Sequence, residues 1–207
     1  MTHVLSDVEE TSHEGNKFHI GTLKTLQGIT MLKNTVLSTK KVSTLLAAAL
    51  FGALALAPVA SAVTPTTLTT TQKAQLKFLV EEEKLARDVY TYLSAQVTTR
   101  KFSNIARSEQ THMNYMATLL TKHKLWNPTT NRKAGVFYNQ EIQGLYNTLT
   151  AEGAVGLVEA YGVGVKVEEV DIASIKEILL KAMPVDVKAA LDLMLAASYN
   201  HLEAFQY

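Results

Sequence analysis

The stretch from Ser103 to His123 places the strongest constraint on how this chain can fold. Apolar residues recur in it at helical spacing, among them Ile105, Met116 and Leu119, which predicts one amphipathic helix. Glu109 and His112 fall on the same face, because residues three apart on a helix lie one turn apart. Burying both costs on the order of several kcal/mol unless each finds a partner. The helix must therefore pack where a metal ion or a hydrogen-bond network compensates them.

Three further stretches repeat this pattern of an apolar stripe interrupted by an ionisable side chain. They run from about Thr71 to Val97, from Ala154 to Ala182 and from Val185 to Phe205. The interrupting side chains are Glu83, Glu168 and His201, each well inside its stretch. The sequence therefore predicts four long helices, and no part of residues 63–207 alternates long enough to predict a strand.

The connections between these stretches predict how the helices pack. Thr98–Lys101 is so short that the first two helices are expected to form an antiparallel hairpin. Asn127 and Pro128 end the second helix, and Glu141–Thr150 has the apolar spacing of a short helix. Pro184 separates the last two. We therefore expect an all-α fold, an antiparallel four-helix bundle with a short extra helix between helices two and three.

Local signals predict the beginnings of two helices and the points of closest packing. Thr71 and Ser103 are the expected N-caps of the first two helices, because hydroxyl side chains accept hydrogen bonds from free backbone N–H groups. Gly156, Gly162 and Gly164 weaken the third helix intrinsically. We expect them to allow close approach of a neighbouring helix or to mark a kink.

The first 62 residues have the composition of a targeting segment. Three lysines precede an apolar run, residues 42–56, and a small-residue motif follows it up to Ala62, an order typical of a secretory signal peptide. Cleavage near Ala62 would make the protein secreted or periplasmic; the alternative is a membrane anchor formed by residues 42–62. The expected parts are a non-native or disordered extension (1–30), a signal peptide (31–62), a tether (63–71) and a helical domain (72–207).

Composition excludes several classes of protein. The chain of 207 residues is 47% hydrophobic with a formal net charge of +1, and it contains no cysteine. It therefore lacks the basic excess of nucleic-acid-binding proteins, and disulfides, thiolate nucleophiles and cysteine zinc sites are excluded. Histidine, carboxylate, backbone and water are the metal ligands that remain. We expect the mature domain to bind neither nucleic acid nor membrane.

Five ionisable side chains are expected to face one volume inside the bundle: Glu83, Glu109, His112, Glu168 and His201. Di-iron and di-manganese carboxylate proteins take one Glu from each of two helices and a Glu-x-x-His pair from each of the other two. Carboxylate oxygens combined with imidazole suit iron or manganese. The sequence therefore predicts a metal site, with a metal-free carboxylate–histidine network or a decayed site as the alternatives.

The fourth helix departs from the complete pattern. It reads Ser198-x-x-His201, so a serine stands where a carboxylate is expected. Serine is a poor ligand unless it is deprotonated, and a second ion would lose a ligand that neutralises its charge. Glu82, Glu169, Asp171 or water can fill the gap. The sequence leaves open whether the site holds one ion or two.

Four motifs resemble a known family: Glu81–Tyr90 (EEEKLARDVY), Phe102–Met113 (FSNIARSEQTHM), Val167–Ile172 (VEEVDI) and Ser198–Phe205 (SYNHLEAF). Over most of residues 70–207 the chain resembles an uncharacterised bacterial and archaeal family, domain of unknown function 2202, in the ferritin-like superfamily. The resemblance implies a ferritin-like bundle and a di-iron centre with the five residues above at ligand positions. It implies little about activity.

Two functions fit these features. The first is an exported ferritin-like metalloprotein that binds iron, or iron and manganese, and either reacts with O₂ or peroxide or handles iron. The second is a non-enzymatic helical module of the cell envelope with a structural or vestigial metal site. A secreted domain meets its metal outside the cytoplasm, where zinc competes with iron at a site of nitrogen and oxygen ligands. The expected partners are metal ions and, in a homodimer, a second copy of the chain.

Overall fold

The computed structural model describes residues 65–207, which form five α-helices and no β-strand. Four helices are long: α2 (Thr70–Ser94), α3 (Lys101–Lys122), α5 (Leu157–Leu179) and α6 (Val185–Gln206). The shorter α4 (Gln140–Gly153) comes between α3 and α5 in the sequence. The expected all-helical class is therefore confirmed over the described residues.

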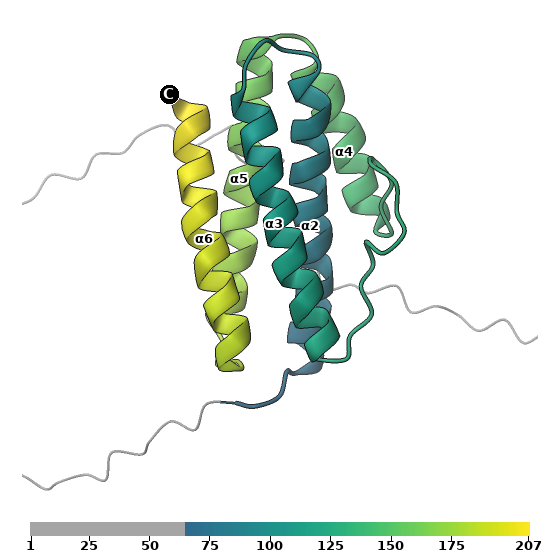
Figure 1. Cartoon of the computed structure of the whole chain (residues 1–207), viewed down its shortest axis with the longest axis vertical. Helices are drawn as coiled ribbons and strands as arrows, with labels where there is room; N and C mark the ends of the chain where they lie inside the picture. The colour runs from purple at the N-terminus through teal and green to yellow at the C-terminus, as the bar shows by residue number, and fades with distance from the viewer. Residues whose placement is uncertain (1–64) are drawn as a thin grey trace, which may run out of the picture.

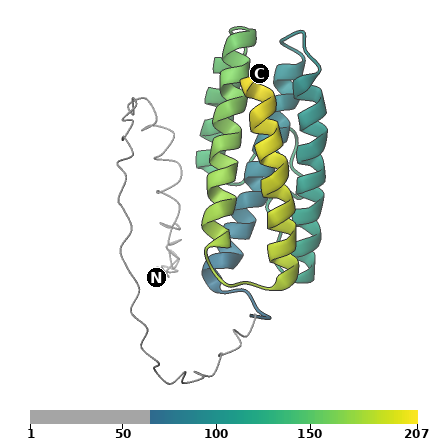
Figure 2. The same cartoon turned by 90° about the vertical axis from the view of Figure 1, so that its left-hand side faces the viewer.

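The four long helices lie side by side, each against two others (Figures 1 and 2). α2 and α6 both pack against α3 and against α5. Within each pair, α2 with α3 and α5 with α6, the two helices run in opposite directions (Figure 1). α4 lies outside this group, against α2 and α5. The inward faces of the four long helices therefore share one interior.

α2 begins at Thr70 because Thr69 is its N-cap. The Thr69 hydroxyl accepts a hydrogen bond from the backbone N–H of Gln72 (3.2 Å), and the Gln72 side chain accepts one from the backbone N–H of Thr69 (3.0 Å). This reciprocal capping box satisfies two free donors at once. The prediction of Thr71 as the cap is wrong by two residues, because Thr71 lies in the first turn.

α3 also begins earlier than expected. It starts at Lys101, and its N-cap residue, Arg100, makes no side-chain capping bond. The Ser103 hydroxyl donates instead to the backbone carbonyl of Arg100, at 3.1 Å. Ser103 is therefore not the cap that the sequence predicted.

The start and the packing of α5 differ in part from expectation. The helix begins at Leu157 rather than at Ala154, which is the C-cap of α4. A Cβ atom on Gly164 would lie 2.5 Å from the ring of Phe205, whereas one on Gly162 would meet nothing within 4 Å. The expected close approach therefore occurs at Gly164 and not at Gly162.

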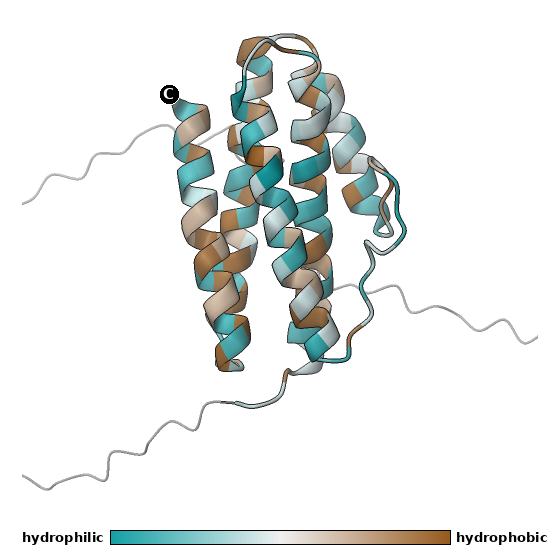
Figure 3. Cartoon of the chain, in the orientation of Figure 1, coloured by the Kyte–Doolittle hydropathy of each residue, from teal (hydrophilic) through white to brown (hydrophobic). Residues whose placement is uncertain are grey.

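The core has two apolar parts. The first is rich in aromatic rings and includes Tyr90, Phe102 and Phe205. The second is aliphatic and includes Leu76, Met116 and Leu191, and Figure 3 shows the matching apolar turns in the lower half of α6. On each long helix, the predicted ligands lie between residues of one part and residues of the other: Glu83, Glu109, His112, Glu168 and His201. A polar layer therefore divides the core at mid-height.

Several expectations concern residues that the structure does not describe. The extension over 1–30 and the signal peptide or anchor over 31–62 lie outside the described residues, so they stay predictions. The expected tether is described only from Pro65, and its Leu68 is already buried in the aliphatic part of the core. Within residues 65–207, no helix has both the length and the apolar character needed to cross a membrane.

Candidate metal centre

The five predicted side chains come together in the polar layer. Each is between 1% and 8% exposed: Glu83, Glu109, His112, Glu168 and His201. α2 and α5 each bring one Glu, α3 brings the Glu-x-x-His pair, and α6 brings one histidine. All five lie on inward faces, because each stands in the apolar stripe of its helix and that stripe faces the core.

Glu109 occupies the middle of the group. Its Oε2 lies 2.8 Å from Nδ1 of His112, and its Oε1 lies 2.7 Å from Nδ1 of His201. The two imidazole rings are stacked, with centroids 5.7 Å apart. A single carboxylate thus faces both histidines, one with each oxygen.

The other two carboxylates stand on either side of this unit. Glu83 Oε2 lies 3.1 Å from Nδ1 of His112, and Glu168 Oε2 lies 3.6 Å from Nδ1 of His201. The result is two groups of three donors, within each of which the donor atoms lie within 4.8 Å of one another. The groups share Glu109, and each can hold a metal ion.

The donor atoms are not satisfied by hydrogen bonds alone. Among residues 65–207, three buried atoms of the group have no hydrogen-bond partner: Glu83 Oε1, Glu109 Oε1 and His201 Nδ1. The last two are only 2.7 Å apart, yet they lack hydrogen-bond alignment. A buried polar atom left unpaired costs about 1–3 kcal/mol. A cation in each of the two groups would give these unpaired atoms a partner, so the donor set fits a metal.

The five side chains have strongly shifted pKa values. Burial raises the pKa of Glu83 and of Glu168 to about 8. Burial also opposes the charge on both histidines, but the carboxylates close to their rings outweigh it and raise the pKa of His112 to about 11 and of His201 to about 9. For Glu109 the two nearby imidazoles overcome burial and lower its pKa to about 2. These shifts favour the protonated form of four of the five candidate ligands at neutral pH, and a metal would have to displace those protons.

Tyr90 supports one side of the centre. The side chain is fully buried, and its hydroxyl donates to Glu168 Oε1 at 2.6 Å. Its ring contacts those of Phe102 and Phe205, with centroids 5.9 Å and 5.2 Å away. Tyr90 shares a helix with Glu83, but its hydrogen bond goes to Glu168 on α5.

A second layer of buried polar groups lies beside the centre. The Ser198 hydroxyl donates to Asp171 Oδ2 (2.6 Å), and the Ser174 hydroxyl donates to Glu82 Oε1 (3.0 Å). Sequence reasoning offered Glu82, Asp171 and Glu169 as substitute ligands without choosing among them. Only the first two are buried, and Glu169 is partly exposed.

Two further buried charges on α2, Lys84 and Asp88, bind the loop that follows α3. Lys84 is 1% exposed, pairs with Asp88, and donates to the backbone carbonyl of Lys133 at 2.9 Å. Asp88 also accepts from the backbone N–H of Gly135 (2.9 Å) and from the guanidinium of Arg87. These bonds tie the connection between α3 and α4 to α2, which explains why charged residues are buried there.

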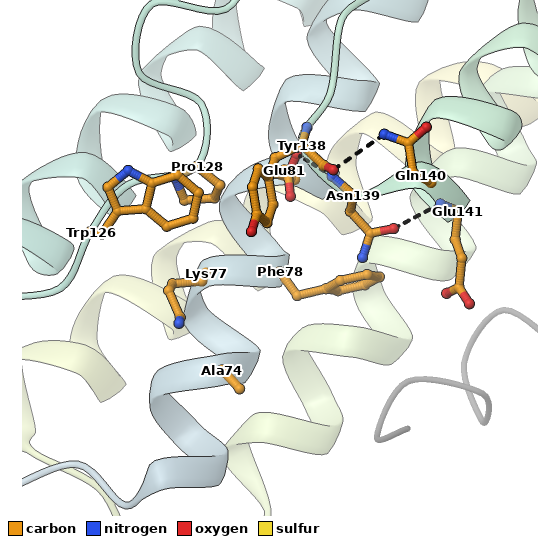
Figure 4. Close-up of a pocket in the computed structure, with 10 residues that line it drawn as sticks. All are labelled: Ala74, Lys77, Phe78, Glu81, Trp126, Pro128, Tyr138, Asn139, Gln140 and Glu141. Atoms are coloured by element: carbon orange, nitrogen blue, oxygen red, sulfur yellow. Dashed lines mark hydrogen bonds between the residues drawn. The ribbon is translucent and has the colours of Figure 1, made fainter. Parts of the chain in front are cut away.

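Glu81 also binds the connection between α3 and α4, at the edge of a surface pocket. Its carboxylate accepts from the backbone N–H groups of Tyr138 (2.6 Å) and Asn139 (3.2 Å). The pocket has a volume of about 320 Å³, and Figure 4 shows Trp126 and Tyr138 on one side of it and Lys77 below. None of the five candidate ligands lines it. It is therefore separate from the buried centre.

His123 differs from the other two histidines of the described chain. It lies at the end of α3, and its Nε2 is 3.1 Å from Asp186 Oδ2 at the start of α6. The side chain is largely buried and joins two helices, away from the centre.

Comparison with known proteins agrees with this fold. The family model described as an uncharacterised protein domain (DUF2202) matches residues 72–207. The uncharacterised protein MJ0754 of Methanocaldococcus jannaschii is 39% identical over 134 residues, which is 65% of this chain and 72% of that protein. The crystal structure of hypothetical protein MJ0754 from Methanococcus jannaschii DSM 2661 matches with a TM-score of 0.66 and 36% identity, covering 70% of this chain and 83% of that one. The chain therefore belongs to the uncharacterised domain family DUF2202.

Proposed function

We propose that this protein is an exported, ferritin-like metalloprotein that holds transition-metal ions between Glu83, Glu109, His112, Glu168 and His201. The observation that carries the proposal is the shared carboxylate: two groups of three buried donors meet at Glu109. A structural network has no need of a carboxylate with both oxygens aimed at histidines and one of them unpaired. Two cation positions bridged by one carboxylate account for this arrangement.

The arrangement of the helices supports the ferritin-like part of the proposal. Four long helices give ligands to one central layer, with single Glu residues on α2 and α5 and histidines on α3 and α6. Di-iron and di-manganese carboxylate bundles distribute their ligands in this way. We therefore assign the four long helices to an antiparallel four-helix bundle, with α4 as an addition to it.

The ligand set favours iron or manganese by its oxygen-rich chemistry, since three carboxylates and two imidazoles are hard or borderline donors. Zinc is the expected competitor, because it binds such sites more tightly than either metal under equal availability. If the N-terminal segment directs export, the centre is loaded outside the cytoplasm. Metal identity then depends on supply in that compartment.

We propose a redox reaction with O₂ or peroxide, or the handling of iron, as the activity. Bound iron or manganese would supply the electrons of the redox chemistry. The protein contributes placement and exclusion of water: Tyr90 holds Glu168 in orientation, and apolar side chains close the centre from both ends. The protons now held by the histidines and the outer carboxylates leave when the metal enters.

Metal analysis tests the proposal. Protein isolated from its native compartment, and metal-free protein reconstituted with Fe²⁺ or Mn²⁺, should contain one or two ions per chain by mass spectrometry. His112→Gln should contain less bound metal than the wild type, because the ion on the α2–α3 side loses a ligand. His123→Gln is the matched control, because His123 pairs with Asp186 outside the centre, and it should keep the wild-type content. Wild-type protein that retains no transition metal after reconstitution contradicts the proposal.

A non-enzymatic envelope module is the second candidate, and Ser198 favours it. Without a carboxylate at that position the ligand set is incomplete, as expected for a structural or vestigial site. Peroxide consumption by the metal-loaded protein distinguishes the two. Consumption that disappears in Glu109→Gln supports an enzyme, whereas metal binding without any turnover supports the module.

A further inference from the structure

Position 198 holds a buried serine with a defined partner. Ser198 is fully buried, and its hydroxyl lies 2.6 Å from Asp171 Oδ2 and 2.9 Å from the backbone carbonyl of Met194. A hydroxyl has one proton, so the contact with the carboxylate is the shorter and stronger of the two. The position that lacks a carboxylate of its own therefore contacts one from the neighbouring helix.

Asp171 is buried and only partly satisfied. It lies one turn after Glu168 on α5 and is 6% exposed. Its Oδ2 accepts from Ser198, but Oδ1 has no hydrogen-bond partner among residues 65–207. Besides burial, the negative charges of Glu83 and Glu109 raise its pKa well above the usual value, and the charge of His112 opposes them. Its place one turn after Glu168, and its contact with Ser198 one turn before His201, put the carboxylate beside the candidate ligands.

We propose that Asp171 supplies the fourth carboxylate charge of a two-cation centre, from α5, and that Ser198 orients it. The inference rests on the proposed function and deepens it. Glu83, Glu109 and Glu168 leave two divalent cations with one uncompensated positive charge when both histidines are neutral. With Asp171, four carboxylates balance the four positive charges of the two cations, and burying an uncompensated charge is costly.

The other candidates do not meet this requirement. Glu82 is buried and lines the same small apolar cavity as Asp171, with a volume of about 10 Å³, but its carboxylate accepts from Ser174 on α5 and not from Ser198, the position on α6 that lacks a carboxylate. Glu169, next to Glu168 in the sequence, is partly exposed. Asp171 itself is not part of either group of three donors. Asp171 therefore acts through its charge and is not itself one of the metal ligands.

The decisive experiment is a Mn²⁺ titration of the metal-free full chain, with bound metal counted by equilibrium dialysis and mass spectrometry. Wild type should bind two ions. Asp171→Asn should weaken the second ion by about 10–100-fold, the range typical of outer groups that support metal ligands. Ser198→Ala should weaken it less, because the carboxylate remains. Glu169→Gln on the same helix is the matched control and should titrate like wild type.

A swap of the two positions tests the assignment directly. Asp171→Ser combined with Ser198→Glu moves the carboxylate to α6, where the complete pattern has it, and should restore two ions. Circular dichroism melts of each metal-free variant check that it folds. If Asp171→Asn binds metal with the wild-type stoichiometry and affinities, this inference is overturned and the proposed function still stands. Wild type that binds no ion overturns the proposed function and the inference together.

Discussion

The α2–α3 pair and the α5–α6 pair each bring one Glu and one histidine to the centre, and they differ at the remaining position. On α3 that position is Glu109, three residues before His112; on α6 it is Ser198, three residues before His201. The outer carboxylates differ too. Glu83 lies 3.1 Å from its histidine, whereas Glu168 lies 3.6 Å from its own and accepts from Tyr90.

This difference teaches that similar halves can give unequal sites. In the proposed centre, the α2–α3 side has all three of its donors on its own helices, while the α5–α6 side shares Glu109 and has Tyr90 and Asp171 as supporting neighbours. An ion on the α2–α3 side should therefore bind first and more tightly. The variants below test that order.

Glu109→Gln should have the largest effect because both halves use this carboxylate. We expect the loss of both ions, and a free energy of unfolding of the metal-free protein lower by about 3–5 kcal/mol, the cost of removing one partner of a buried ion pair. The measurements are metal content and urea denaturation. Retention of one tightly bound ion would show that Glu109 is not shared.

His112→Gln and His201→Gln separate the halves. Each removes one imidazole ligand, so each should leave one ion bound. The ion that remains in His201→Gln should bind with nearly wild-type affinity, since its donors on α2 and α3 are intact. The ion that remains in His112→Gln should bind more weakly. Equal affinities in a Co²⁺ titration followed by absorbance would contradict the unequal halves.

The pH dependence of stability should differ between metal-free and metal-loaded protein. The pKa values of Glu83 and Glu168 are raised to about 8, and those of His112 and His201 to about 11 and 9. The folded state therefore binds more protons than the unfolded state, so the metal-free protein loses stability as pH rises from about 5 to 9.

Metal displaces these protons, and the loaded protein should show the reverse trend because binding tightens as pH rises. Thermal melts between pH 5 and 9, with chelator and with Mn²⁺, measure both slopes. Below pH 4.5 the low pKa of Glu109, about 2, should make the metal-free protein lose stability again. A metal-free melting temperature that increases up to pH 9 would contradict this assignment of protons.

Tyr90→Phe should have the smallest effect. Only the α5–α6 half of the proposed centre should be affected, because Tyr90 donates to Glu168. The variant keeps the ring packing but removes the hydrogen bond to Glu168. We expect the α5–α6 ion to bind about tenfold more weakly, the lower end for groups that orient a metal ligand, with the other ion unchanged. A Mn²⁺ titration resolves the two affinities. Equal weakening of both ions would show that Tyr90 supports the whole centre.

Much of the fold and the candidate site could be predicted from single helices. Glu83, Glu109, Glu168 and His201 interrupt apolar stripes, and a stripe identifies the inward face of a helix without knowledge of its neighbours. Helix beginnings were less predictable. Thr69 and Thr71 are chemically alike, and only the reciprocal bond with Gln72 selects the first.

Burial of Glu81 and Glu82, which precede Glu83 on α2, could not be predicted in the same way. Three successive Glu residues usually form a solvated face, but Glu81, Glu82 and Glu83 are all buried. Each uses a different neighbour: the backbone at Tyr138, the hydroxyl of Ser174, and the centre. None of these partners is within helical reach in the sequence.

The sequence by itself determined which side chains face the interior, because the period of an α-helix depends only on local backbone geometry. Tertiary structure alone decided which of them meet. Tyr90 pairs with Glu168, Ser198 with Asp171, and Gly164 with Phe205. These pairs depend on the rotation and height of one helix against another, which packing of the whole core sets.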